Sequence, residues 1–290
     1  MTQEPITTPT TSNRCELRAV DNAAYHSDKD ILSSSMLKHA LESPAQFIAS
    51  LTTPSNRTDA KDFGTLIHAL ILEPHTVQSL VAISAQPLGR DADSKKFRKA
   101  NADRICLSIA EFASATQLAD KVLSTMFRGR PFYKFVEEGT VESSIYYTDP
   151  TTGIECRTRL DLMHPDFTFD IKTTRQSTAP AFQRDAISMH YDLSAYMYSL
   201  SRVLLEKNPT PKPFVLVPVC TDAPHSVFFM PCSSSVLENG QRKYNAALST
   251  IQACTRVNHW PGLDGEYEMD IEPWQAFTPE PAPWRKTALT

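Results

Sequence analysis

Apolar and polar residues alternate between Ile154 and Thr174, a stretch that reads IECRTRLDLMHPDFTFDIKTT. Because side chains two positions apart in a strand share a face, this alternation predicts a β-hairpin. His164-Pro165-Asp166 supplies the turn, since Pro and Asp both favour turns. One face of the hairpin is mostly apolar and is suited to packing on a core. The other face carries the charged side chains of Glu155, Arg157, Arg159, Asp161, Asp170 and Lys172.

The hairpin belongs to a larger predicted sheet. Three antiparallel strands are expected, over 141–148, 154–163 and 167–173. The segment 214–220, FVLVPVC, is almost uniformly apolar and predicts a buried strand. A long helix precedes it, so this strand can lie parallel to an earlier one. Residues 226–231 predict one more strand.

Helical periodicity predicts helices around this sheet. Apolar positions recur every three or four residues over 59–72, 107–127, 179–206 and 236–256. Two shorter helices are expected before them, one capped by Ser33 or Ser34 and one beginning at Ser43-Pro44. Gly64 lies inside a predicted helix, where Gly costs about 1 kcal/mol relative to Ala, so we expect close packing there. The fold class expected is α/β (α+β), with a mixed sheet flanked by helices.

Composition is typical of a soluble globular protein, with 41% hydrophobic and 21% charged residues in 290. No apolar run approaches the roughly 20 residues of a membrane helix. The N-terminus lacks a basic region followed by an apolar one, so we expect a cytoplasmic protein without a secretory signal. Three parts are expected: a disordered tail over 1–20, a domain over 21–260, and a Pro-rich acidic arm over 261–290.

Charge and cysteine spacing narrow the function classes. The net charge is −4, so a nucleic-acid enzyme would need a local positive groove. The basic residues of 84–104 could form part of a phosphate-binding rim or simply a solvated loop and helix start. The six cysteines form no C-x-x-C pair, which argues against zinc-ribbon and iron–sulfur sites.

The charged face of the hairpin suggests metal-assisted phosphodiester cleavage. Carboxylate oxygens such as those of Asp161 and Asp170 suit Mg²⁺ or Mn²⁺. Lys172 could orient a water and offset phosphate charge. The spacing Asp-x8-Asp-x-Lys is a weak signal on its own, because Asp-x-Lys triplets are common. The competing interpretation is a solvated strand face with cross-strand ion pairs.

Other candidate residues each have a structural alternative. Hydroxyl groups at the start of a helix near Ser33 can cap it or hold a phosphate. His68, on the apolar helix 59–72, can be a core residue or a metal ligand. Arg157 and Arg159 should point into a cleft with Asp161 and grip DNA phosphate, since guanidinium binds phosphate in a bidentate manner. Alternatively they only pair with neighbouring carboxylates across the sheet.

Five separated stretches resemble one family, in the order that the family has them, over roughly residues 25–200. They read ILSSSMLKHALESPAQF, DFGTLIHALILEP, TTGIECRTRLDLM, FDIKTT and YDLSAYMY. The chain resembles the C-terminal nuclease domain of RecE-type exonucleases (exonuclease VIII), within the PD-(D/E)xK superfamily. The resemblance implies a PD-(D/E)xK restriction-endonuclease-like core.

The resemblance also implies roles. Mg²⁺ is the expected cofactor, with Mn²⁺ as a substitute, and Asp161, Asp170 and Lys172 are the expected catalytic residues. The metal ligands implied are His68, Asp161, Asp170 and the backbone carbonyl of Ile171. DNA contacts are expected at Ser33, Ser35, Arg157, Arg159, Thr173 and Tyr198. Members degrade linear double-stranded DNA from 5′ ends, leaving 3′ single strands for a RecT-like annealing recombinase, and form toroidal homo-oligomers, typically tetramers.

The sequence departs from the family pattern at one position, and two alternative functions fit it. The family's helix after the Asp-x-Lys strand usually carries Gln-x-x-x-Tyr, and here Ser194 stands where Gln is expected while Tyr198 keeps the Tyr place. The first alternative is a RecB-like or CRISPR-associated nuclease of another repair or defence pathway. The second is a non-catalytic DNA-end-binding protein, which the presence of His68, Asp161, Asp170 and Lys172 disfavours.

Overall fold

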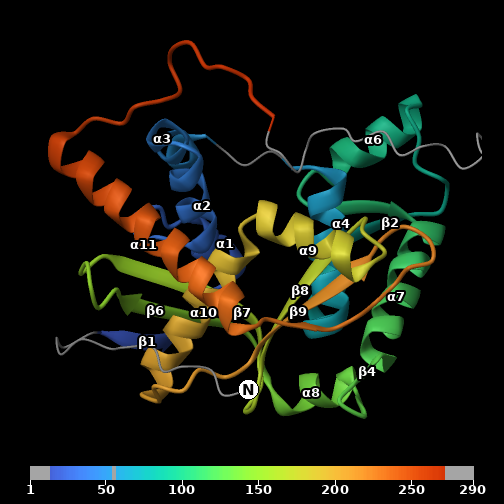
Figure 1. The fold of residues 1–290 in the computed structure, drawn as a ribbon. Coiled ribbons are helices and arrows are strands. Elements are labelled where there is room, and N and C mark those ends of the chain that lie inside the picture. Colours follow the sequence, from blue (N-terminus) through green and yellow to red (C-terminus); the bar gives the residue numbers. More distant parts are fainter. Residues whose placement is uncertain (1–13, 54–56, 272–290) are drawn as a thin grey trace, which may run out of the picture.

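A six-stranded mixed sheet forms the centre of the protein in a computed structural model that describes residues 14–53 and 57–271 (Figure 1). The strand order is β1-β6-β7-β8-β9-β10. The strands are β1 (Cys15–Arg18), β6 (Thr140–Thr148), β7 (Glu155–Met163), β8 (Thr168–Thr174), β9 (Phe214–Cys220) and β10 (Met230–Pro231). Only β8 and β9 pair in parallel among these neighbours, so the predicted antiparallel hairpins and the parallel return strand are confirmed.

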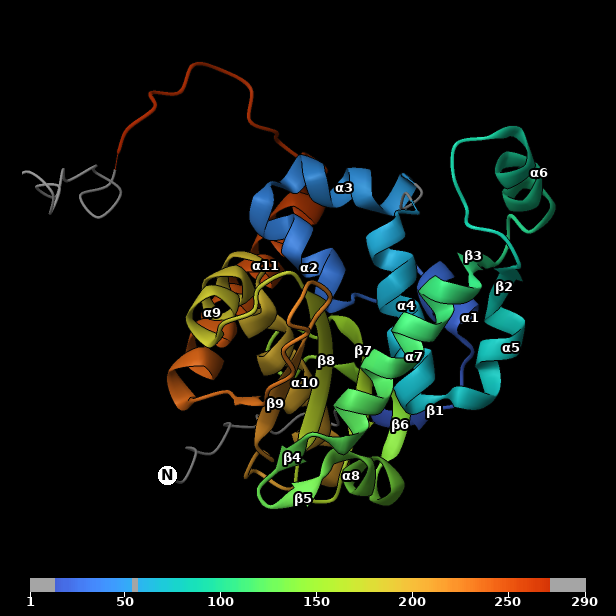
Figure 2. The same ribbon diagram turned by 90° about the vertical axis from the view of Figure 1, so that its right-hand side faces the viewer.

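Helices cover both sides of this sheet (Figure 2). One group comprises α2 (Ser34–Glu42), α3 (Pro44–Thr52), α9 (Ala179–Ser188), α10 (Tyr191–Glu206) and α11 (Ser234–Val257). The other comprises α4 (Asp59–Leu72), α7 (Ile109–Ser124) and α8 (Phe132–Glu138). β9 is buried along its whole length because Phe214 and Leu216 pack with α9 and α11, while Val215 and Val217 pack with α4 and α7. Burial on both faces explains its continuous apolar sequence.

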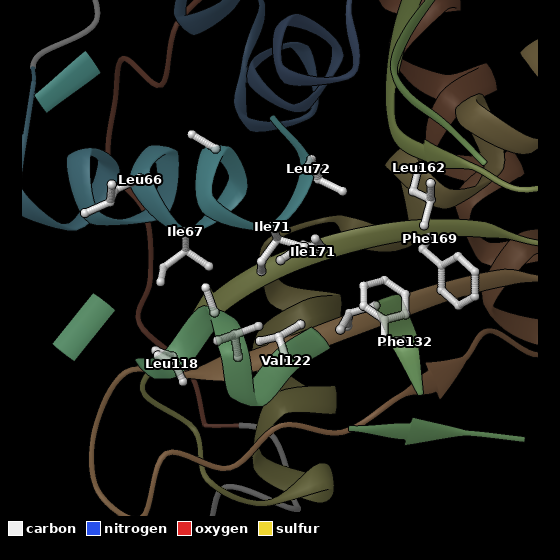
Figure 3. Close-up of a cluster of buried hydrophobic side chains, with 14 of the residues drawn as sticks. Leu66, Ile67, Ile71, Leu72, Leu118, Val122, Phe132, Leu162, Phe169 and Ile171 are labelled. Atoms are coloured by element: carbon white, nitrogen blue, oxygen red, sulfur yellow. The ribbon is translucent and has the colours of Figure 1, made fainter. Parts of the chain in front are cut away.

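The core beneath α4 and α7 holds these helices against the β7–β8 hairpin (Figure 3). Ile67 and Ile71 of α4 meet Ile171 of β8, and Phe132 of α8 meets Phe169. All five side chains are buried. Burying a side chain of this size contributes roughly 1.5–3 kcal/mol, so the apolar face of the hairpin fixes where its polar face lies.

Several short elements were not predicted. Residues 15–18 were expected in the tail but form β1, which pairs with β6. The helix α1 (Asn22–Ser27) follows it. The other unpredicted short elements are η1 (Pro74–Thr76), α5 (Val77–Leu80), β2 (Val81–Ser84), β3 (Ile105–Ser108), β4 (Met126–Phe127) and β5 (Arg130–Pro131). Helix α6 (Ala92–Ala100) lies within 84–104, where a loop and helix start were one of the two interpretations.

The single helix predicted over 179–206 is wrong, because the chain breaks it into α9 and α10. His190, between them, has a left-handed backbone (φ 53°) that ends one helix and redirects the next. The strand predicted over 226–231 is reduced to β10 and one bridge from Val227 to Val219. The end of the predicted domain and the start of the predicted C-terminal arm both pack on α3. Trp260 stacks on Phe47 with ring centroids 5.4 Å apart, and the carbonyl of Pro261 accepts from the N–H of Ala45 at 3.1 Å.

The rest of that arm, 272–290, and residues 1–13 lie outside the described residues. Within the described ranges, no helix combines the length and apolar character needed to cross a bilayer.

The strands β7 and β8 separate soon after their turn. Their ladder contains two residue pairs, Leu162 with Phe169 and Met163 with Thr168. Beyond these pairs, Leu32 occupies the free edge of β7: its N–H donates to the carbonyl of Glu155 (3.0 Å) and its carbonyl accepts from the N–H of Arg157 (2.8 Å). The segment that leads into α2 therefore lies along β7, where β7 no longer pairs with β8.

Candidate active site

Asp161 lies where β7 and β8 part. Its Oδ2 accepts a hydrogen bond of 2.7 Å from the backbone N–H of Ile171 on β8. A strand amide that lacks a ladder partner must find another acceptor when buried, and here the carboxylate provides it. The separation of the strands thus places one predicted acid inside the sheet, with its other oxygen free for a ligand.

His68 reaches the same point from α4. Its Nε2 lies 2.9 Å from the carbonyl oxygen of Ile171, and its Nδ1 lies 3.6 Å from Oδ2 of Asp161. Gly64, one turn earlier, faces β8: a Cβ there would lie 3.2 Å from Oγ1 of Thr173. The glycine therefore allows the close approach of helix to strand that its position suggested.

Asp170 and Lys172 share the other side of β8. Lys172 Nζ lies 2.6 Å from Asp170 Oδ2, and Asp170 is 1% exposed. Burial raises the pKa of the Asp170 carboxyl above its usual value. Burial alone would lower the pKa of Lys172, but the charges of Asp170 and Asp161 outweigh it and raise that pKa. Lys172 is therefore a cation in this structure.

Glu142 on β6 is a site residue that the sequence did not single out. It lies opposite Asp161 between the paired positions Val141–Leu162 and Ser143–Leu160. Its backbone adopts φ 48°, in a region that residues with a Cβ rarely enter. Such strain, of order 1–3 kcal/mol, concentrates at functional sites. No sequence pattern marks it, because Glu142 is one charged residue in an otherwise ordinary strand.

A group of three potential ligands results. One ligand atom each from His68, Glu142 and Asp161 lies within 4.8 Å of the others. Burial, together with the charges of Asp161 and Glu73, raises the pKa of Glu142 to about 8. Mutually repelling carboxylates beside an imidazole are the donor set that a divalent cation neutralises, so these residues fit a metal. Asp170 lies outside this group, and its role as a ligand stays a prediction.

The serines at the start of α2, Ser33 to Ser35, lie near the site. Ser33 is the N-cap residue, but its hydroxyl makes no capping hydrogen bond and instead lies 3.0 Å from that of Ser35. Ser34 Oγ lies 3.5 Å from the hydroxyl of Tyr198. Side-chain capping by Ser33 or Ser34 is therefore not observed. The proposed DNA contacts of Ser33, Ser35, Thr173 and Tyr198 stay predictions.

Arg157 and Arg159 do not point into an open cleft, contrary to expectation. Both lie against the ring of Tyr25 on α1, at 4.9 and 4.3 Å from its centroid. Arg157 is 2% exposed and pairs with Asp28 (3.2 Å), whereas Arg159 donates to Ser144 and to backbone carbonyls before α1. The unpredicted helix α1 covers this strand face, and DNA contacts by these arginines remain untested.

The structure also shows where Ser194 and the basic segment 84–104 lie. Ser194 is buried on α10, with its N–H donating to the carbonyl of His190. Five basic residues of 84–104 are exposed on and beside α6, which projects from the periphery (Figure 2): Arg90, Lys95, Lys96, Arg98 and Lys99. Arg104 is half-buried and donates to the carbonyls of Gln78 and Val81. The role of this segment as a phosphate rim stays a prediction.

Comparison with known proteins agrees with this geometry. The family described as "PDDEXK-like domain of unknown function (DUF3799)" matches residues 33–272. A crystal structure from Eubacterium rectale, described as "Putative exonuclease", shares the fold with a TM-score of 0.58 at 10% identity, over 88% of this chain and 97% of that one. No curated protein matches the sequence. The predicted fold class is confirmed, and the chain belongs to the family described as a PDDEXK-like domain of unknown function, within the PD-(D/E)xK superfamily.

Proposed function

We propose that this chain is a Mg²⁺-dependent exodeoxyribonuclease that degrades linear double-stranded DNA from 5′ ends and leaves 3′ single strands. The observation that carries the proposal is the meeting of His68, Asp161 and Glu142 at the point where β7 and β8 part, beside the Asp170–Lys172 pair. The resemblance to RecE-type exonucleases supplies the direction of digestion and the product.

His68, Glu142, Asp161 and the carbonyl of Ile171 would hold the metal, together with Asp170. A bound divalent cation would supply Lewis-acid activation of water and neutralise phosphate charge. Lys172, held beside Asp170, would place positive charge next to the attacked phosphate. Asp170 holds the ammonium in place, and the hydrogen bond from Ile171 fixes the carboxylate of Asp161.

The cellular setting is part of the proposal. The 3′ strands would serve recombination through a RecT-like single-strand annealing partner in the cytoplasm. The active unit would be a homo-oligomeric ring, typically a tetramer, around the DNA. A blunt-ended duplex long enough to thread through such a ring is therefore the proper substrate for a first assay.

The test is digestion of duplexes labelled at a single 5′ end or a single 3′ end, with Mg²⁺ or with EDTA. We expect early release of the 5′ label as short products, retention of the 3′ label on long strands, and no release in EDTA. A circular duplex is the matched control and should survive.

Three outcomes would contradict parts of the proposal. Early release of the 3′ label would reverse the direction, and cleavage of the circle would indicate an endonuclease. Binding to DNA ends without any Mg²⁺-dependent cleavage would favour the non-catalytic alternative.

A further inference from the structure

Lys38 on α2 is a second lysine beside the catalytic one. Its Nζ lies 4.9 Å from the centroid of the Tyr191 ring, and Lys172 Nζ lies 5.5 Å from the same centroid. Ser34, four residues earlier and so on the same face of α2, is the residue that approaches Tyr198. The two lysines, from elements far apart in sequence, therefore share one aromatic ring at the site.

Lys38 differs from Lys172 and Lys243 in its polar contacts. Within the ranges that the structure describes, it makes no hydrogen bond or ion pair. The nearby acids have other cations: Asp170 pairs with Lys172, and Asp192 pairs with Lys243 at 2.9 Å. The two carboxylates nearest to Lys38 are thus already paired with other ammonium groups.

Keeping an ammonium in this place is unfavourable for the protein alone. Burial, assisted by the charge of Lys172, lowers the pKa of Lys38 to about 8. A partly buried cation without a partner weakens the folded state unless an anion compensates it. Such perturbed groups gather at functional sites. The missing partner should be an oxyanion that arrives with the substrate.

We propose that Lys38 binds a phosphate of the DNA strand next to the scissile phosphate. The ring of Tyr191, which both lysines contact, would position the Lys38 and Lys172 ammonium groups for two neighbouring phosphates. This inference rests on the proposed function for its ligand. The chemistry is that of a phosphate monoester or diester, which can come from a terminal 5′-phosphate or from an internal phosphate of the strand. Helix α2 packs with α10 and α11, and Lys38 lies against Tyr191 at the start of α10, whereas His68 on α4 lies beside Asp161. Lys38 would therefore serve a different phosphate from the metal group.

The first test needs no nuclease activity. At pH 7 in EDTA, inorganic phosphate should raise the melting temperature of the full chain, and Lys38→Met should lose most of that rise. Lys38→Arg should keep it. Lys207→Met is the matched control, because Lys207 is exposed at the opposite end of α10. No rise for the wild type, or an equal rise for Lys38→Met, would overturn the inference even if the protein cleaves DNA.

The second test identifies the source of the phosphate. Binding of duplexes with 5′-phosphate or 5′-hydroxyl ends is measured in Ca²⁺ at several salt concentrations. Lys38→Met should weaken binding at least about tenfold and make the salt slope shallower by about 0.9, while Lys207→Met should change neither. A loss confined to the 5′-phosphorylated duplex assigns Lys38 to the terminal phosphate, and an equal loss on both assigns it to an internal one. Wild-type slope and affinity in Lys38→Met, with intact cleavage, would reject Lys38 and spare the proposed function.

Discussion

At the scale of single residues, the site combines groups that the sequence reveals with one that only the backbone reveals. Motif spacing and the resemblance predicted four of these residues, because their residue types themselves suggest metal and phosphate chemistry: His68, Asp161, Asp170 and Lys172. Glu142 was not predicted, since its importance lies in a left-handed φ and in its place opposite Asp161. Reading a strand from side-chain alternation assumes extended backbone throughout and so misses such a residue.

The strain at Glu142 predicts an unusual pair of variants. Glu142→Gly should be more stable than Glu142→Ala by about 1 kcal/mol, because a residue with a Cβ is disfavoured at this φ and glycine is not. Both should bind Mg²⁺ more weakly than the wild type. Denaturant unfolding in EDTA and calorimetric titration of Mg²⁺ measure the two effects. Equal stability of the two variants would show that the backbone is not strained.

Glu142 also predicts a dependence on pH. Its pKa rises from an ordinary value of 4.5 to about 8 in the folded protein, so the native state binds more protons than the unfolded state between these values. Its stabilising contribution is therefore complete below about pH 4.5 and lost as the pH rises through about 8. In EDTA, the wild type should lose stability relative to Glu142→Gln between pH 5 and 8. Parallel profiles for the two proteins would contradict this.

Asp161 predicts a difference between two neutral replacements. Asp161→Asn keeps an acceptor for the N–H of Ile171, whereas Asp161→Ala leaves that buried amide unpaired at about 1–3 kcal/mol. Both should lose cleavage by more than about a hundredfold, since even partners outside a ligand shell cost 10–100-fold. Thermal melting in EDTA separates them, and Asp170→Asn serves as the second inactive control. Substantial Mg²⁺-dependent digestion by Asp161→Asn would remove Asp161 from the site.

At the scale of elements, long periodic segments were predicted well and short ones were not. Helix α4 and strands β6 to β9 lie where apolar periodicity placed them, because burial on a large core enforces that pattern. α1 and β1 are too short for a period to show. The break at His190 was not predicted because the apolar spacing continues across it, whereas the φ angle of His190 is positive.

Two glycines at helix contacts predict Gly→Ala effects of very different size. A Cβ at Gly240 on α11 would lie 2.0 Å from the backbone oxygen of Asp192, so only glycine fits there. Gly240→Ala should destabilise the protein by about 3 kcal/mol or more. Gly64→Ala, which meets only the side chain of Thr173 and gains helix propensity, should change stability by less than about 1 kcal/mol. Denaturant unfolding compares the two, and equal effects would contradict the packing described.

At the scale of the whole molecule, the site lies where three separate parts of the chain meet. α4, the β7–β8 hairpin and the segment that leads into α2 come from different regions of the sequence, and two cores hold them together. The sequence could predict the fold class, because its elements and the resemblance agreed. It could not predict that the N-terminal segment would cover Arg157 and Arg159, since that depends on tertiary packing of a short, polar helix.

This covering predicts a structural role for Arg157. Arg157→Ala should destabilise the protein by roughly 2–4 kcal/mol, because it breaks a mostly buried pair with Asp28 and removes contact with Tyr25. The salt slope of DNA binding should stay unchanged. Unfolding and binding in Ca²⁺ at several salt concentrations measure both, with Arg175→Ala on the exposed surface as control. A slope shallower by about one would restore Arg157 as a phosphate contact.

The bond between Asp161 and the amide of Ile171 bears on how this protein can evolve. A lineage that abandons cleavage cannot freely discard the acid, because a nonpolar replacement would leave a buried peptide group without a partner. Drift at this position should favour residues that still accept a hydrogen bond, above all asparagine. An amide retained there in a descendant would record inherited architecture without cleavage, whereas the proposed activity would require the acid at 161 together with Glu142 and the Asp170–Lys172 pair.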